Sequence, residues 1–148
     1  MNKFSSETIK KILVPTDGSD YSTRAAEYAI SIAKMHDAQI IFAYVVDEIV
    51  VDQFSKASER EAIESDLKKS GQRAIKYVVN LAEAAGVKAT SKLVKGRPFE
   101  QIVNLAKSFE IDLIVMGTYG HRGAERILIG SVAERVIEYS PCPVLVIK

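Results

Sequence analysis

The residues of this chain best suited to chemistry form a glycine-rich stretch that runs from Gly117 to Ser131. Four of the eight glycines lie between Gly117 and Gly130, directly after the apolar run 113–116. Glycine lets main-chain amides approach a bulky anion closely and tolerates positive φ. A strand that feeds such a loop, with a helix N-terminus at its far end, forms a binding site for phosphate. The stretch therefore predicts a loop that holds the phosphates of a nucleotide.

Other kinds of phosphate and catalytic site lack their sequence patterns. No Gly-x-x-x-x-Gly-Lys-Ser/Thr run occurs, which argues against a Walker-type nucleotide hydrolase, and the dinucleotide fingerprint Gly-x-Gly-x-x-Gly is also missing. His36 and His121 lie far apart in sequence, and with Cys142 they offer no metal-ligand spacing. Nothing resembles a nucleophile elbow. Asp17 is the carboxylate best placed to assist a metal-bound phosphate.

Strands and helices alternate along the chain, and this alternation indicates how the glycine-rich stretch is positioned. The apolar patterns predict strands at 11–16, 39–46, 87–94, 111–116 and 144–148, and helices at 20–35, 58–85, 98–106 and 132–137. Alternating β and α units of this length predict an α/β fold with a parallel sheet, helices on both faces and right-handed crossovers. We expect one open five-stranded Rossmann-like sheet with strand order 3-2-1-4-5.

Several positions refine this expectation. The run 39–46 is apolar on both faces and should be central, whereas 87–94 is more polar and should lie near an edge. Ser58 with Glu61 is typical of a capping box that begins the second helix. We expect a single domain over 1–148, with an N-terminal tail at 1–9 and a flexible connection at 47–57, where no period is visible.

In open α/β sheets, ligands bind at the carboxyl ends of the strands, where the strand order reverses. Here that switch point lies between the first and fourth strands. The first strand ends at Pro15-Thr16-Asp17 and the fourth at Met116-Gly117. Two polar, glycine-bearing loops should therefore meet in one crevice.

Composition restricts the partners and the compartment. Twenty basic and nineteen acidic residues give a net charge of +1 without a basic stripe, so we expect no nucleic-acid partner. No apolar run approaches the roughly 18 residues that a membrane span needs, so we expect no membrane association. The single Cys142 cannot form an intrachain disulfide, which suits the cytoplasm.

The spacing Gly117-x2-Gly120-x9-Gly130-Ser131 resembles the ATP-binding motif of the universal stress protein family. The similarity extends to four further segments: Ile12-Leu-Val-Pro-Thr-Asp-Gly-Ser19, Tyr44-Val-Val-Asp47, Gly96-Arg-Pro98 and Ser140-Pro-Cys-Pro-Val-Leu-Val-Ile147. The resemblance implies a fold like that of the adenine nucleotide alpha hydrolases and ATP as the ligand. It leaves open whether Mg²⁺ or Mn²⁺ accompanies the nucleotide.

The resemblance also implies roles for individual positions. By similarity to ATP-binding members, Pro15, Thr16 and Asp17 line the adenine and ribose side. The main chain of Val45 reads the adenine edge. The remaining positions lie under the ribose or hold the triphosphate: Met116, Gly117, Gly120, Gly130, Ser131 and Val132. Arg122 either contacts a phosphate or is a solvated loop residue. The family commonly dimerises through its last strand, so we expect a homodimer through 144–148.

Simpler structural roles remain open for two of these positions. Ser131 with Glu134 matches a capping box, and Asp17 could merely stabilise its turn. At the level of function, the resemblance implies an ATP-binding stress-response sensor or signalling module with at most weak ATP hydrolysis. One alternative is a slow ATPase or a phosphate- or adenylyl-transfer enzyme that uses Asp17 and a metal ion. Another is a scaffold that pairs through its last strand and binds no nucleotide.

Overall fold

The computed structural model describes residues 9–118 and 129–148. A five-stranded sheet with order β3-β2-β1-β4-β5 forms its centre, and every pair of neighbouring strands is parallel. The strands are β1 (Lys11–Pro15), β2 (Gln39–Asp47), β3 (Ala89–Gly96), β4 (Leu113–Gly117) and β5 (Val144–Ile147). The predicted α/β fold and strand order 3-2-1-4-5 are therefore confirmed, including the switch point between β1 and β4.

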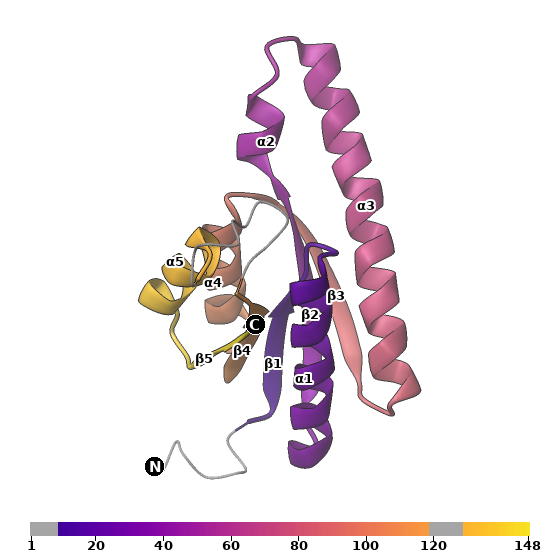
Figure 1. Cartoon of the computed structure of the whole chain (residues 1–148), viewed down its shortest axis with the longest axis vertical. Coiled ribbons are helices and arrows are strands. Elements are labelled where there is room, and N and C mark those ends of the chain that lie inside the picture. The colour runs from indigo at the N-terminus through magenta and orange to yellow at the C-terminus, as the bar shows by residue number, and fades with distance from the viewer. Residues whose placement is uncertain (1–8, 119–128) are drawn as a thin grey trace.

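Helices cover both faces of the sheet (Figure 1). They are α1 (Asp20–His36), α2 (Glu48–Asp52), α3 (Ala57–Ala84), α4 (Pro98–Ser108) and α5 (Ser131–Tyr139). One buried cluster joins α1 and α3 to the sheet, and a second joins α4 and α5 to its other face. Within the described ranges, no helix is long and apolar enough to cross a membrane.

Local chemistry explains where several helices begin. The Ser19 side chain accepts a hydrogen bond from the amide of Ser22, which caps α1, and Pro98 occupies the first turn of α4 as expected. The capping box predicted at Ser58 is wrong. Helix α3 begins at Ala57, and its N-cap is Lys56, two residues before the predicted cap, with no side-chain hydrogen bond. Ser58 lies inside the first turn of α3, so its hydroxyl is not in the N-cap position, where it would accept a hydrogen bond from an amide of that turn.

The segment 47–57, expected to be a flexible connection, contains the short helix α2. The Asp47 carboxylate accepts a hydrogen bond from the Ile49 amide at 3.0 Å and caps this helix. Val51 is buried and packs in a cluster with Tyr44, Val46 and Ile75. Five helical residues are too few to display a period, so the sequence pattern could not indicate α2.

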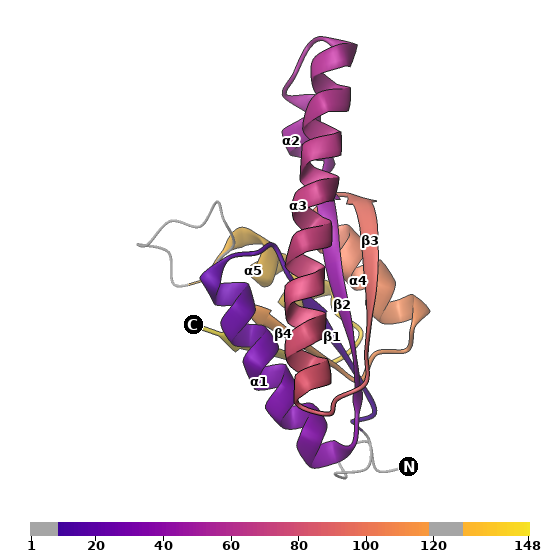
Figure 2. The ribbon, with the colours of Figure 1, turned by 90° about the vertical axis from the view of Figure 1, so that its right-hand side faces the viewer.

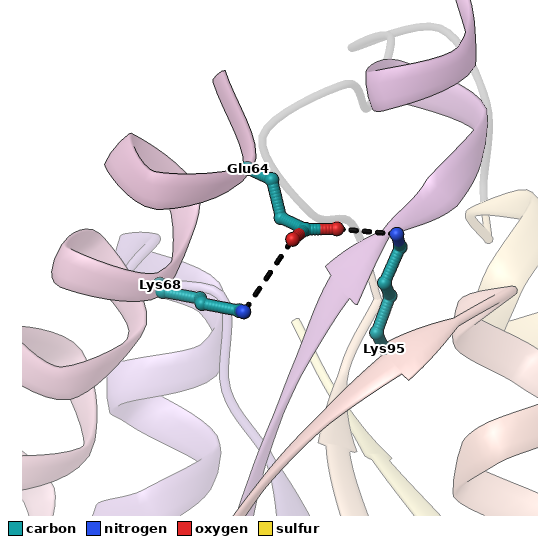
Figure 3. A network of polar contacts seen from close by, with 3 residues as sticks. All are labelled: Glu64, Lys68 and Lys95. Atoms are coloured by element: carbon teal, nitrogen blue, oxygen red, sulfur yellow. Dashed lines mark ion pairs between the residues drawn. The ribbon is translucent and has the colours of Figure 1, made fainter. Parts of the chain in front are cut away.

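Together, α2 and the first part of α3 (residues 48–66) form an arm that projects beyond the carboxyl ends of the strands (Figures 1 and 2). Glu64 on α3 pairs with Lys95 on β3 and, at 3.4 Å, with Lys68 (Figure 3). Arg97, which follows β3, lies 3.9 Å from Glu48 on α2. The pairs Glu64–Lys95 and Glu48–Arg97 connect the arm to the end of β3, at the carboxyl edge of the sheet where a ligand is expected.

Candidate functional site

Three of the predicted site residues come from different elements and share one face of the sheet. Met116 of β4 is buried in the cluster between the sheet and helices α4 and α5. Val45 of β2 and Val132 of α5 pack against the same cluster and remain partly exposed. Because all three lie toward the carboxyl ends of the strands or at the start of α5, they bring an apolar surface to the predicted crevice.

The turn after β1 divides its side chains between the two faces of the sheet. Pro15 pairs with Ala43 in the parallel register and, by strand alternation, follows Leu13 on the α4 and α5 face. Thr16 points the other way. Its hydroxyl lies 3.2 Å from Ser22 Oγ, and its amide donates to the Ala43 carbonyl at 2.8 Å. The amide and the hydroxyl of Thr16 thus both have hydrogen-bond partners within the protein, which sequence reasoning did not anticipate.

Asp17 has a structural role in this turn. Its Oδ1 accepts a hydrogen bond from the Ser19 amide at 2.9 Å, and Gly18 adopts a positive φ of 82°. This geometry bears out the simpler role considered for Asp17, because a short polar side chain that bonds two residues ahead stabilises a turn. The same bond holds the carboxyl group at the carboxyl end of β1, where the ribose side of a nucleotide site is expected.

Gly117 is required by packing, not by its backbone angles. A Cβ atom at this position would lie 2.8 Å from Tyr21 Cβ and 2.9 Å from the Tyr21 carbonyl carbon. Any larger residue would therefore press against the main chain of α1. Positive φ among the described glycines occurs at Gly18, Gly86 and Gly96, so the conformational freedom expected in the glycine-rich stretch is not used at Gly117.

The start of α5 is where the phosphate contacts were predicted. Gly130 is the N-cap residue with φ of −71° and ψ of 158°, and no side chain caps this helix among the described residues. Ser131 is the first helical residue and is exposed. The capping-box interpretation of Ser131 with Glu134 is therefore wrong. The hydroxyl of Ser131 projects from the first turn of α5 and is not used to cap it.

The base of the glycine-rich stretch is closed by hydrogen bonds that the sequence did not reveal. The Gly130 amide donates to the Thr118 carbonyl at 2.7 Å. Thr118, which is 4% exposed, also donates twice to the Ile147 carbonyl, from its amide at 2.8 Å and its hydroxyl at 2.7 Å. Only the fold brings Thr118 next to Ile147, which lies 29 residues later in the chain.

Two carboxylates act on the phenol of Tyr44 at this edge of the sheet. Burial raises the pKa of the Tyr44 phenol, and the nearby charges of Asp17 and Asp47 raise it further. The phenol therefore remains neutral at physiological pH. In the described ranges, no three His, Cys, Asp or Glu side chains form a group that could hold a metal ion.

Five predicted site residues in the described part of the chain lie toward the carboxyl edge of the sheet, on the side where α5 begins. They are Pro15, Asp17, the partly exposed Val45, Met116 and Gly117. Thr16 belongs to the same turn, but its side chain faces α1. Gly120 and Arg122, also predicted as site residues, lie outside the described residues, as do residues 1–8 of the expected N-terminal tail.

Known proteins resemble this chain in sequence and in fold. The model of the universal stress protein family matches residues 8–148. Universal stress protein MJ0531 of Methanocaldococcus jannaschii is 50% identical over 139 residues, which cover 94% of this chain and 82% of that protein. The solved structure of protein MJ0577 from the same organism has a TM-score of 0.87 and 31% identity, covering 95% of this chain and 96% of that one.

A universal stress protein solved in complex with cAMP is also similar. Its TM-score is 0.72 at 29% identity, with 94% of this chain and 97% of that chain covered. The family match covers almost the whole sequence, and the structural matches share its sheet and helices. By this evidence, the chain belongs to the universal stress protein family.

Proposed function

We propose that this protein binds ATP at the carboxyl edge of β1 and β4 and acts in the cytoplasm as a nucleotide-dependent sensor or signalling module of the stress response. The adenine would lie beside Val45, the ribose near Pro15 and Asp17, and the phosphates against the start of α5. The main-chain amides of Ser131 and Val132 would donate to the phosphates, together with the Ser131 hydroxyl. Gly120 and Arg122 complete the proposed phosphate contacts.

The observation that carries this proposal is the first turn of α5. A helix N-terminus presents amides without intrahelical partners and the positive end of the helix dipole. In α5 no described side chain caps these amides, and Ser131 keeps its hydroxyl exposed beside them. The starts of α3 and α4 also lack a side-chain cap, but α5 follows β4, one of the two strands at the switch point where open α/β sheets bind ligands. The α5 terminus is therefore suited to an anionic ligand.

The apolar side of the crevice suits a purine base. Val45 offers partly exposed apolar surface at the adenine side, and it packs against the buried cluster that contains Met116. The related protein solved with cAMP binds a ligand that combines adenine, ribose and phosphate. A site with one apolar end and one end lined by amides can hold such a ligand in a single orientation.

The residues fit a divalent cation only if the nucleotide supplies most of its ligands. Mg²⁺ is commonly bound through one or two carboxylates together with phosphates and water. Asp17 is the described carboxylate placed for this role, and its Oδ1 already accepts the Ser19 amide. Magnesium or manganese would therefore enter the site bound to ATP.

We also propose that the protein forms a homodimer through 144–148. β5 lies at the edge of the sheet, and Leu145 is 37% exposed there. An apolar edge strand favours pairing with a second chain. Two copies related by a two-fold axis would place the same strand against itself.

Titration calorimetry and thermal melting with ATP test the proposed binding. At a hundredfold excess over the dissociation constant, ATP should stabilise the fold by about 2.7 kcal/mol. For a domain of this size, the melting temperature should rise by about 5–10 °C. A melting temperature unmoved by millimolar ATP, with no calorimetric heat, favours the scaffold alternative. Multiple turnovers of labelled ATP with magnesium, reduced by Asp17→Asn, would instead support the slow ATPase or transfer enzyme.

A further inference from the structure

Thr118 connects the start of the glycine-rich stretch to the last strand. Its amide and its hydroxyl both donate to the Ile147 carbonyl, at 2.8 and 2.7 Å, and its own carbonyl accepts the Gly130 amide at 2.7 Å. Thr118 is therefore bonded at once to the N-cap of α5 and to the end of β5. Because the Thr118 side chain is 4% exposed, water does not compete freely for its hydroxyl.

One side of β5 pairs with β4, and its other side faces outward. The carbonyls of Pro143 and Ile147 face β4, since they accept the amides of Ile114 and Thr118. In a parallel ladder, alternate residues turn their polar groups toward the same neighbour. The amides and carbonyls of Val144 and Val146 therefore face away from β4, along the free edge of the sheet. β5 thus lies between Thr118 on one side and this open edge on the other.

We propose that Thr118 is a positioning residue that couples nucleotide binding to pairing of two copies along the outer edge of β5. This inference rests on the proposed ATP site and homodimer. A phosphate held at the first turn of α5 restricts the motion of Gly130. Gly130 in turn restricts the motion of Thr118, because the Gly130 amide donates to the Thr118 carbonyl. Thr118 then holds the Ile147 carbonyl with two hydrogen bonds, which orders the end of β5. An ordered edge has less conformational freedom to lose when a second copy pairs with it.

Thermodynamic linkage gives this proposal a strict consequence. If ATP tightens the dimer by some factor, dimerisation must tighten ATP binding by the same factor. Couplings of this kind are typically about 5- to 150-fold. The hydroxyl of Thr118 should carry a large part of the coupling, because it supplies one of the two bonds to Ile147 and a side-chain substitution removes it without touching the backbone.

The test compares the wild type with Thr118→Val and Thr118→Ser. Val keeps the shape and loses the hydroxyl, whereas Ser keeps the hydroxyl and loses a methyl group. Sedimentation velocity gives the dimer dissociation constant of each protein with and without ATP, and calorimetry gives the ATP dissociation constant. In the wild type, we expect ATP to lower the dimer dissociation constant by at least about fivefold. In Thr118→Val this factor should fall toward one, and in Thr118→Ser it should be retained.

A second variant is used if the wild-type dimer is too tight for its dissociation constant to be measured. Val146→Pro removes an outward-facing amide and should prevent pairing, while the bonds between β5 and β4 remain. Under the proposal, this monomer binds ATP more weakly than the wild-type dimer, by about fivefold or more. Hydrogen exchange at the amides of Leu145 and Ile147, which face β4, should slow on ATP binding in this monomer as well, and less so when Thr118→Val is added.

The outcomes separate this inference from the proposed function. A wild type that binds no ATP overturns both. A wild type that binds ATP and stays monomeric at saturating nucleotide overturns the coupling and the proposed homodimer, and leaves the proposed ATP site standing. The coupling is also overturned if ATP leaves the dimer dissociation constant of the wild type unchanged. It is overturned as well if Thr118→Val, shown to be folded by circular dichroism, keeps the wild-type factor between the dimer dissociation constants with and without ATP. For a wild-type dimer that does not dissociate, the contradicting result is a Val146→Pro monomer that binds ATP as tightly as that dimer.

Discussion

Substitution of Ser131 by Ala separates ligand binding from helix capping. Ser131 is the first residue of α5 and is exposed, and the N-cap position belongs to Gly130 without a side-chain hydrogen bond. Loss of the hydroxyl should therefore change the free energy of unfolding by no more than about 0.5 kcal/mol, as for other surface positions. A hydrogen bond to a charged group contributes about 1.5–3 kcal/mol. If the hydroxyl donates to a phosphate, ATP affinity should fall about 10- to 150-fold.

Calorimetric titration with ATP and urea denaturation without ligand measure these two effects. Ser58→Ala is the matched control, because Ser58 is an exposed serine in the first turn of α3, on the arm. Its ATP affinity and its stability should both equal those of the wild type. If Ser131→Ala loses stability by more than about 1 kcal/mol while its ATP affinity stays unchanged, the hydroxyl caps α5 and the reasoning about the phosphate contact is refuted.

Three further predictions concern packing and titration. In Gly71→Ala, the new Cβ would lie 2.5 Å from Tyr44 Cδ1. The free-energy cost of overpacking, about 1–3 kcal/mol, should exceed the gain of about 1 kcal/mol in helix propensity, so urea denaturation should show a less stable protein. Burial raises the pKa of the Cys142 thiol, so at pH 8 iodoacetamide should modify the folded protein more slowly than the urea-unfolded chain. Lys95 lowers the pKa of Glu64, so this pair stabilises the fold above pH 4.5 and less as the pH falls; acid titration of stability should be shallower in Glu64→Gln.

The fold was largely predictable because its signals are local and repeated. Apolar runs of strand length alternate with helical patterns, and this alternation leaves few topologies for a parallel sheet. The polar character of β3 indicated its place at an edge, and the apolar β2 indicated a central place, as the strand order confirms. The convergence of the β1 and β4 ends at a switch point followed from the same topology.

The parts that sequence reasoning missed depend on single atoms or distant partners. The N-cap position depends on the backbone angles of a single residue, which the sequence does not show. Ser58 and Ser131 match the capping-box motif, but the N-cap residues of α3 and α5 are Lys56 and Gly130. The two bonds from Thr118 to Ile147 join positions that only the sheet brings together.

The side to which a strand-end side chain turns is equally hard to read from sequence. The hydroxyl of Thr16, a residue predicted to line the adenine and ribose side, lies 3.2 Å from Ser22 Oγ of α1. The reason for Gly117 was also different from the one expected, since α1 approaches too closely for a Cβ atom there.

The central claim is that amides at the start of α5 hold the phosphates of the bound nucleotide. Its most direct test is the ratio of the dissociation constants of adenosine and ATP, measured by calorimetry on the wild-type protein in one buffer. Several charge-assisted hydrogen bonds to the phosphates should make ATP bind at least about 100-fold more tightly than adenosine. Adenosine that binds as tightly as ATP would contradict the claim, because the site would then recognise the base and sugar without the phosphates.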